Sequence, residues 1–65
     1  MKNKYFLRVQ MHGFSDTIEV LAHDVQISDG SYKFVEDMGN HWKILALYPV
    51  QYTIIHKIEP IKTQD

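Results

Sequence analysis

Four histidines offer this chain its widest choice of chemistry, because an imidazole can bind a metal ion or transfer a proton near neutral pH. They are His12, His23, His41 and His56. A zinc site needs three or four ligands that converge within about 2.1 Å of the metal. His12 lies at the end of the first expected strand and His23 at the end of the second. In a hairpin of these two strands, the two histidines lie at opposite ends. We therefore expect partly exposed histidines at strand ends, and only a metal ion shared between subunits stays open as an alternative.

Serines and carboxylates offer the next chemistry, which is nucleophilic attack and acid–base catalysis. Ser15, Ser28 and Ser31 fall in expected turns, without the strand-to-helix elbow that exposes a nucleophilic serine. Turn formation and solubility explain the closely spaced carboxylates, which are Asp16 with Glu19 and Glu36 with Asp37. The chain has no cysteine, which removes thiol nucleophiles and disulfides. We expect a protein that is not an enzyme and that needs no cofactor.

The length of the chain limits what these side chains can build. With 65 residues and 7.7 kDa, it exposes roughly 4,300 Å² when folded against roughly 11,200 Å² when unfolded, so about 60% of its surface is buried. That is enough for one small domain, over residues 1–60, with a frayed tail at 61–65. It leaves no room for a deep catalytic cavity beside a core, and self-association would add stability.

Hydropathy and charge narrow the setting. No apolar run approaches the roughly 18 residues of a membrane span, and Arg8 interrupts the apolar stretch 5–7 too early for a signal peptide. Together with the absence of cysteine, this predicts a cytoplasmic protein without a membrane partner. The net charge is −1, and residues 9–32 contain no Lys or Arg. A nucleic-acid binder usually has a concentrated basic face, so nucleic acid is the less favoured partner.

Alternation of apolar and polar residues predicts β-strands along most of the first half of the chain. The expected elements are a strand over 5–12, a turn over 13–16 and a strand from 17 to 23. The alternation reverses between Ala22 and Val25, which predicts a bulge or sharp bend near His23 and Asp24. Asp29-Gly30 then predicts a hairpin, because both central residues of a type I′ turn need positive φ.

The second half continues with strands. A strand beginning at Tyr32 leads to a turn over 36–40, and 41–48 is apolar on both faces. That pattern is typical of a central strand, or of one whose outer face meets a partner. A turn or single helical turn follows near Pro49, and a last strand places Tyr52, Ile54 and Ile58 on one face. We predict an all-β fold, a five- to six-stranded antiparallel meander that forms a small open barrel, SH3-like in one version, or a strongly twisted sheet.

Alternate residues of each expected strand point inward and outward, which divides the large side chains into two sets. Inward positions carry most of the aromatic residues, which are Tyr5, Tyr32, Phe34, Trp42, Tyr48 and Tyr52. Outward positions carry five apolar residues, Phe6, Leu21, Val35, Leu45 and Leu47. Five apolar residues on faces that should meet water indicate a second buried surface. A barrel wall, a sister subunit or another protein would each provide one.

The segment from Val25 to Phe34, with its Asp29-Gly30 hairpin, precedes Ile44-Leu45-Ala46-Leu47-Tyr48-Pro49 and a closing Ile54-Ile55. This order, over residues 18–58, resembles small β proteins encoded by bacteriophages and prophages. The resemblance implies a phage gene product in a bacterial cytoplasm. Some phage proteins of this size block host defence, either by binding a defence protein or by sequestering a signalling nucleotide. No functional residue is carried over from the resemblance.

Three functions follow as hypotheses. The first is a homo-oligomeric, non-enzymatic protein that inhibits a host process, most concretely antiviral defence, by binding a host protein through its outward apolar residues. The second is an oligomeric sponge that sequesters a nucleotide signal between subunits, using aromatic residues with Lys4, Arg8 and Lys43. The third is a small nucleic-acid-binding β-barrel.

Overall fold

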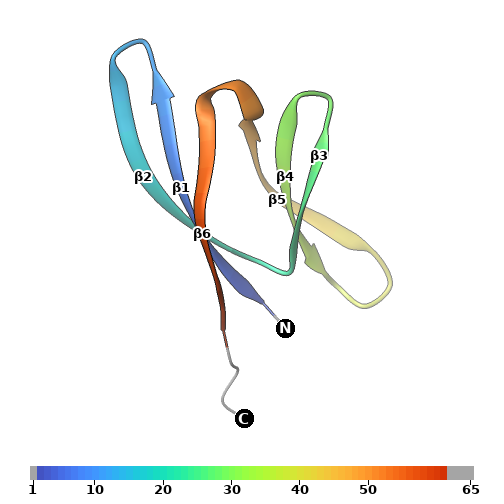
Figure 1. Ribbon diagram of the computed structural model, residues 1–65. Coiled ribbons are helices and arrows are strands. Elements are labelled where there is room, and N and C mark those ends of the chain that lie inside the picture. Colours follow the sequence, from blue (N-terminus) through green and yellow to red (C-terminus); the bar gives the residue numbers. More distant parts are fainter. Residues whose placement is uncertain (1, 62–65) are drawn as a thin grey trace.

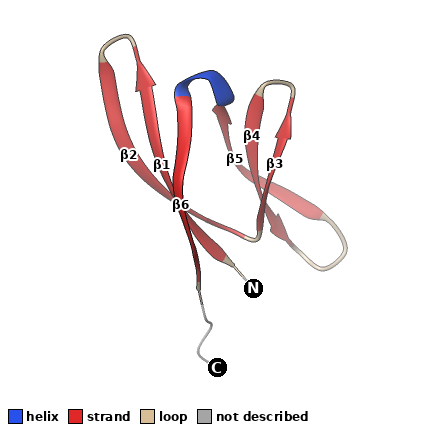
Figure 2. Cartoon of the chain, viewed as in Figure 1, coloured by secondary structure: helices blue, strands red, loops and turns tan. Residues whose placement is uncertain are grey.

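The computed structural model describes residues 2–61 and consists of six antiparallel strands (Figure 1). The strands are β1 (Asn3–Met11), β2 (Phe14–Ala22), β3 (Asp24–Ser28), β4 (Ser31–Asp37), β5 (Trp42–Pro49) and β6 (Thr53–Pro60). One turn of 3-10 helix, η1 (Val50–Tyr52), joins β5 to β6 (Figure 2). The strands form two three-stranded sheets, in the orders β2-β1-β6 and β3-β4-β5. The all-β prediction is confirmed.

Two hairpins have two-residue turns in which both central residues have positive φ. Asp29 and Gly30 have φ of 52° and 72°, so the predicted Asp-Gly hairpin is confirmed. The first hairpin differs from the expected turn over 13–16. Its central residues are His12 and Gly13, with φ of 48° and 80°, and Met11 pairs directly with Phe14. The polar residues after Gly13 belong to β2, because they pair with the end of β1 rather than turn the chain.

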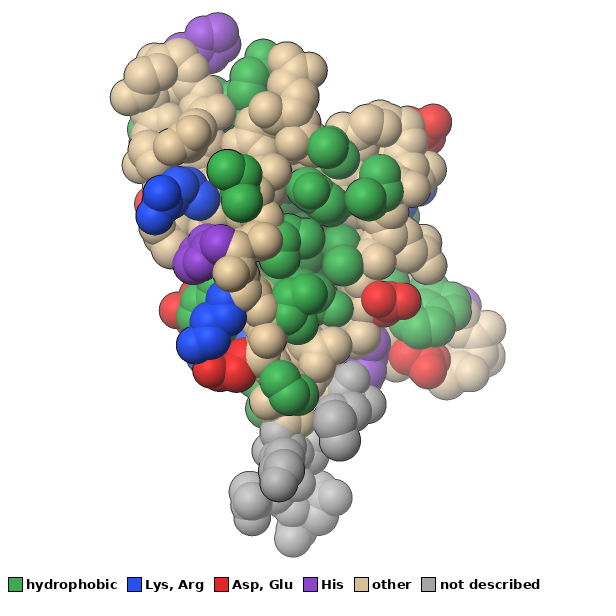
Figure 3. Space-filling view, viewed as in Figure 1, with side chains coloured by type: hydrophobic (Ala, Val, Ile, Leu, Met, Phe, Trp, Pro, Cys, Tyr) green, Lys and Arg blue, Asp and Glu red, His purple; other side chains and the backbone are tan. Residues whose placement is uncertain are grey.

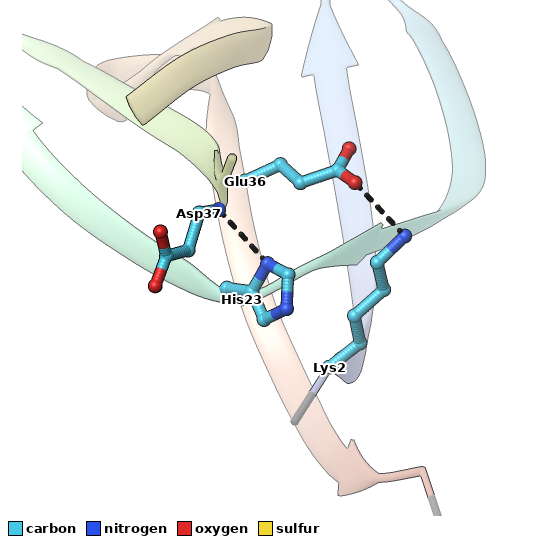
Figure 4. A network of polar contacts seen from close by, with 4 residues as sticks. All are labelled: Lys2, His23, Glu36 and Asp37. Atoms are coloured by element: carbon cyan, nitrogen blue, oxygen red, sulfur yellow. Dashed lines mark hydrogen bonds and ion pairs between the residues drawn. The ribbon is translucent and has the colours of Figure 1, made fainter. Parts of the chain in front are cut away.

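The predicted bend lies at His23, where the chain passes from one sheet to the other (Figure 1). Its backbone N–H donates a hydrogen bond to the carbonyl of Val35, at 2.9 Å. The backbone N–H of Asp37 donates to His23 Nδ1, also at 2.9 Å (Figure 4). An Nδ1 that accepts leaves the ring proton on Nε2. Both contacts tie the bend to the end of β4, where Lys2 Nζ also meets Glu36 at 3.3 Å.

The core lies between the two sheets. Tyr5, Leu7, Ala22 and Phe34 are buried there as one cluster. The Phe34 ring contacts Tyr5 edge-on at 5.2 Å and Tyr48 at 6.0 Å between centroids, an arrangement that aromatic rings favour. Partly buried side chains surround the cluster, and they are Ile18, Val20, Val25, Tyr32, Ala46, Tyr48 and Ile55. Most of the aromatic residues expected inside therefore pack in or against this core.

A β-bulge in β6 reverses the expected inward face of its first half. Phe6 pairs with Lys57 but Leu7 pairs with Ile55, which leaves His56 as an extra residue. A one-residue shift moves each side chain to the other face of the sheet. Thr53 and Ile55 therefore face the core, and Ile54 is exposed, contrary to the expected parity.

A second β-bulge, in β5, likewise moves the side chains on one side of it to the opposite face of the sheet. Phe34 pairs with Ala46 but Val35 pairs with Ile44, which leaves Leu45 as the extra residue. Ala46 stays on the core face, whereas Ile44 and Trp42 lie on the outer face of the sheet. The expectation that Trp42 packs inside is thus wrong, and its side chain is 54% exposed.

The two sheets do not close into a complete barrel. β5 and β6 follow each other in the chain but do not pair, and each borders its own sheet. Figure 3 displays hydrophobic side chains gathered between the two sheets, where the core remains partly visible from outside. Two three-stranded antiparallel sheets that do not close agree with the predicted small open barrel or strongly twisted sheet. Of the expected tail, Ile61 donates a backbone hydrogen bond to Lys2, and residues 62–65 lie outside the described residues.

One buried hydroxyl provides a test of the bulge in β6. Thr53 is 4% exposed, and its Oγ1 has no hydrogen-bond partner. Thr53→Val should therefore raise the free energy of unfolding by about 1 kcal/mol, since it removes an unsatisfied polar group without changing the shape. Urea denaturation measures the change. Thr17→Val on the exposed part of β2 is the matched control and should have little effect. A destabilised Thr53→Val variant would contradict the inward position of this residue.

Candidate binding surface

β5 is an edge strand, so the central-strand alternative for this segment is wrong. It pairs only with β4, and its other side has no strand partner among residues 2–61. Such an edge presents free backbone N–H and C=O groups that can pair with another strand. Figure 2 places β5 at the border of its sheet, with η1 leading away from it to β6.

The side chains of β5 are mostly apolar and exposed. Trp42 is 54% exposed, Ile44 52%, Leu45 37% and Leu47 56%. We call these four residues the β5 surface. In the register with β4, Trp42 lies opposite Asp37, Ile44 opposite Val35 and Leu47 opposite Lys33, which places all three on the outer face. The bulge therefore collects on one face residues that strict alternation would divide between the core and the solvent.

Little charge interrupts the β5 surface. Lys43 is the only charged residue of β5, and it pairs in register with Glu36. The register puts Lys43 on the same face as Ala46, away from Ile44 and Leu47. Asp37 and Lys33 of β4 border this apolar patch on the same face. An apolar patch at a sheet edge is typical of a site that another protein covers.

All four edge strands have features that hinder edge-to-edge pairing, and in β5 these are Lys43, the bulge and the terminal Pro49. β2 exposes Asp16 and Glu19, and β3 has only five residues. β6 contains Lys57 and ends at Pro60, which has no backbone N–H. Among the described edge strands, β5 is distinguished by its four exposed apolar side chains, and we take these as the candidate contact with a partner.

The structure divides the five outward apolar residues expected from sequence into separate groups. Leu45 and Leu47 belong to the β5 surface. Leu21 is 49% exposed but lies on β2, in the other sheet. Val35 is 3% exposed, so it is buried within the fold itself, in agreement with the barrel-wall alternative, and offers little surface to a partner. It occupies the central strand of its sheet, where β3 and β5 flank it on both sides.

Phe6 is half-buried on the outer face of the sheet β2-β1-β6, where neighbouring side chains cover part of its ring. Lys4 Nζ lies 5.9 Å and Lys57 Nζ 5.3 Å from the ring centroid, close enough for cation–π attraction. The His56 ring lies 6.3 Å away. Figure 3 displays basic and histidine side chains along this sheet. Phe6 therefore belongs to an aromatic and cationic cluster, distinct from the β5 surface.

The histidines are dispersed over the fold. His12 lies in the first hairpin turn, and His23 lies in the bend between the sheets. His41 Nδ1 contacts Asn40 Oδ1 at 2.6 Å in the β4–β5 loop, and His56 is the extra residue of the β6 bulge. Within residues 2–61, no group of three His, Asp or Glu side chains is placed to hold a metal ion.

Sequence reasoning missed Trp42 and Ile44 as surface residues. The signal was present, because 41–48 is apolar at both parities, and a strand of that kind can supply a surface on either face. Alternation alone places the even-numbered residues of this strand in the core. Only the register with β4 locates the bulge that moves half of them outside.

Comparisons of the chain with family models, with curated proteins and with solved structures found no match. In the described part of the chain, no helix is long and apolar enough to cross a membrane. Function is therefore inferred from the surfaces of the molecule itself.

The outward position of Trp42 predicts unequal effects of two aromatic substitutions. Phe34→Ala should lower the free energy of unfolding by about 3 to 5 kcal/mol, because Phe34 is fully buried. Trp42→Thr should lower it by less than about 1 kcal/mol, since the ring is half in water and Thr suits a strand. Urea denaturation at low protein concentration measures both. Equal losses in the two variants would place Trp42 in the core after all.

Proposed function

We propose that this protein is a non-enzymatic binding protein, and that it acts when its β5 surface docks on a partner protein. One observation carries the proposal: an edge strand with free backbone groups exposes four large apolar side chains. Because these side chains are already about half buried, covering the rest contributes roughly 1 kcal/mol each, and the free edge can add its strand to a partner's sheet. Both contributions favour a protein partner over a small molecule.

The finer form of the proposal concerns the setting. The resemblance to small phage and prophage proteins implies a bacterial cytoplasm, where the partner is a host protein, most concretely one of antiviral defence. Inhibition then requires no chemistry from this chain. It follows from occupying a surface that the host protein needs for its own contacts.

Capture from a bacterial lysate tests the proposal. The immobilised wild-type chain should retain a specific host protein. A Leu45→Asp, Leu47→Asp variant should bind that protein at least about thirtyfold more weakly, because it buries charge at the centre of the contact. Leu21→Asp is the matched control, since Leu21 is similarly exposed but lies in the other sheet, and it should bind as the wild type does.

Two results would contradict this proposal. One is recovery of no host protein under conditions where the chain is folded. The other is recovery that the Leu45→Asp, Leu47→Asp variant leaves unchanged, which would place the contact elsewhere on the molecule.

The cluster around Phe6 favours a second candidate, a sponge for a nucleotide signal. Phe6 offers a ring for a base, and Lys4 and Lys57 lie beside it with charges for a phosphate. Arg8 shares this face, two residues along β1, whereas Lys43 lies in the other sheet. The same face would serve the third candidate, a nucleic-acid-binding barrel, but Glu19 and Glu59 already pair with the two lysines.

Calorimetry separates the sponge from the protein inhibitor. If the chain sequesters a nucleotide signal, a cyclic dinucleotide or ADP-ribose should release heat on titration, and Phe6→Leu with Arg8→Gln should abolish that heat. A direct protein inhibitor should release none with either ligand. Retention of DNA or RNA that weakens steeply with salt would instead favour the nucleic-acid candidate.

A further inference from the structure

We propose that His23 is a pH-sensitive joint between the two sheets. Its neutral ring fastens the bend to the end of β4, and protonation of the ring releases that contact. The joint is a property of the fold itself and needs no partner, so it goes beyond the proposed function. Three features of the structure support it: the direction of one hydrogen bond, the state of the nearby carboxylates and the position of the contact in the fold.

The direction of the hydrogen bond ties the contact to the neutral ring. The backbone N–H of Asp37 donates to His23 Nδ1, and the two nitrogens lie 2.9 Å apart (Figure 4). A backbone N–H can only donate, so Nδ1 is without a proton while this contact exists. A protonated imidazole carries a hydrogen on both nitrogens, and two N–H groups would then face each other. Imidazoles take up this proton between about pH 5 and 8, so acidification within that range breaks the contact.

The carboxylates at the end of β4 already have partners of their own. Glu36 forms an ion pair with Lys2 Nζ at 3.3 Å (Figure 4). The carboxylate of Asp37 points away from the His23 ring in the same view. Its Oδ1 accepts a hydrogen bond from the backbone N–H of Gly39 at 2.9 Å. Neither carboxylate is therefore placed to receive a proton-bearing Nδ1.

The carboxylate next to His23 in the chain is occupied as well. Asp24 Oδ1 accepts a hydrogen bond from the backbone N–H of Val25 at 2.8 Å. None of the ion pairs within residues 2–61 includes the His23 ring, and Lys2, the cation of the same network, contributes only repulsion to a charged ring. Protonation therefore removes a hydrogen bond from the fold without forming an ion pair that would compensate for it.

The position of the contact determines what protonation loosens. His23 lies where the chain passes from one sheet to the other, and its own N–H donates to the carbonyl of Val35 at 2.9 Å. That bond does not involve the ring, so it keeps the bend attached to β4 at any pH. Asp37 is the last residue of β4 and pairs with Trp42, the first residue of β5. Release of Asp37 therefore loosens the Trp42 end of the β4–β5 hairpin and not the whole fold.

The dependence of stability on pH tests this joint. Urea denaturation of the full chain at about pH 8 and about pH 5 gives the unfolding equilibrium constant under both conditions. Because the unfolded chain binds the proton without losing a contact, the constant should rise as the pH falls. His23→Asn offers an amide oxygen as the acceptor but cannot be protonated. Its constant should rise at least about threefold less than that of the wild type, which corresponds to one net hydrogen bond.

His12→Asn is the matched control, because it removes a histidine by the same substitution in the first hairpin turn. The φ of 48° at this position is one that Asn adopts readily. This variant should keep the wild-type dependence on pH.

Nuclear magnetic resonance of the wild-type chain provides a second measurement, which stays valid if His23→Asn fails to fold. The amide proton of Asp37 should shift upfield as the His23 ring takes up its proton, because the amide loses its acceptor. The two signals should therefore titrate together. An Asp37 amide signal that stays unchanged through the ring titration, or a folded His23→Asn variant with the full wild-type dependence on pH, would overturn the proposal.

Discussion

The small volume between two three-stranded sheets governs where the side chains of this protein go. Phe34 and Leu7 are the largest side chains that are fully buried there. The chain contains many more large apolar residues than such an interior accommodates, and eleven of those within residues 2–61 are exposed. Because burial of apolar area is the main source of folding free energy, a chain of this size is stable by a narrow margin and gains from any contact that covers the surplus.

The two bulges determine where that surplus lies. The extra residue in β6 turns Thr53 and Ile55 towards the core, and the extra residue in β5 turns Trp42 and Ile44 away from it. Without the second bulge, alternation would direct Trp42 into the core that Phe34 already fills. The bulge therefore relieves crowding inside and, by the same shift, produces the β5 surface outside. Core packing and the candidate binding surface are two results of one irregularity in the register.

Local signals in the sequence account for the correct predictions, and long-range register accounts for the errors. The Asp29-Gly30 hairpin and the bend at His23 depend on a few neighbouring residues. The Asp-Gly pair and the reversal of apolar and polar alternation were therefore sufficient to predict them. Neither bulge is marked by glycine or proline. Leu45 and His56 become extra residues only through the strands that they face, β4 and β1. The error at Trp42 arises because the sequence of one strand gives the alternation of its side chains but not the strands that it pairs with.

The pairing of β1 with β6 has a consequence for how the chain reaches this structure. β1 begins at residue 3 and its partner β6 ends at residue 60, so the ladder between them closes almost the whole described chain. Forming it requires the largest loss of chain entropy in the fold, and contacts between such distant residues slow folding. During synthesis, the β3-β4-β5 meander emerges complete while β1 still lacks its second neighbour. The sheet β2-β1-β6 can be completed only after β6 has left the ribosomal exit tunnel.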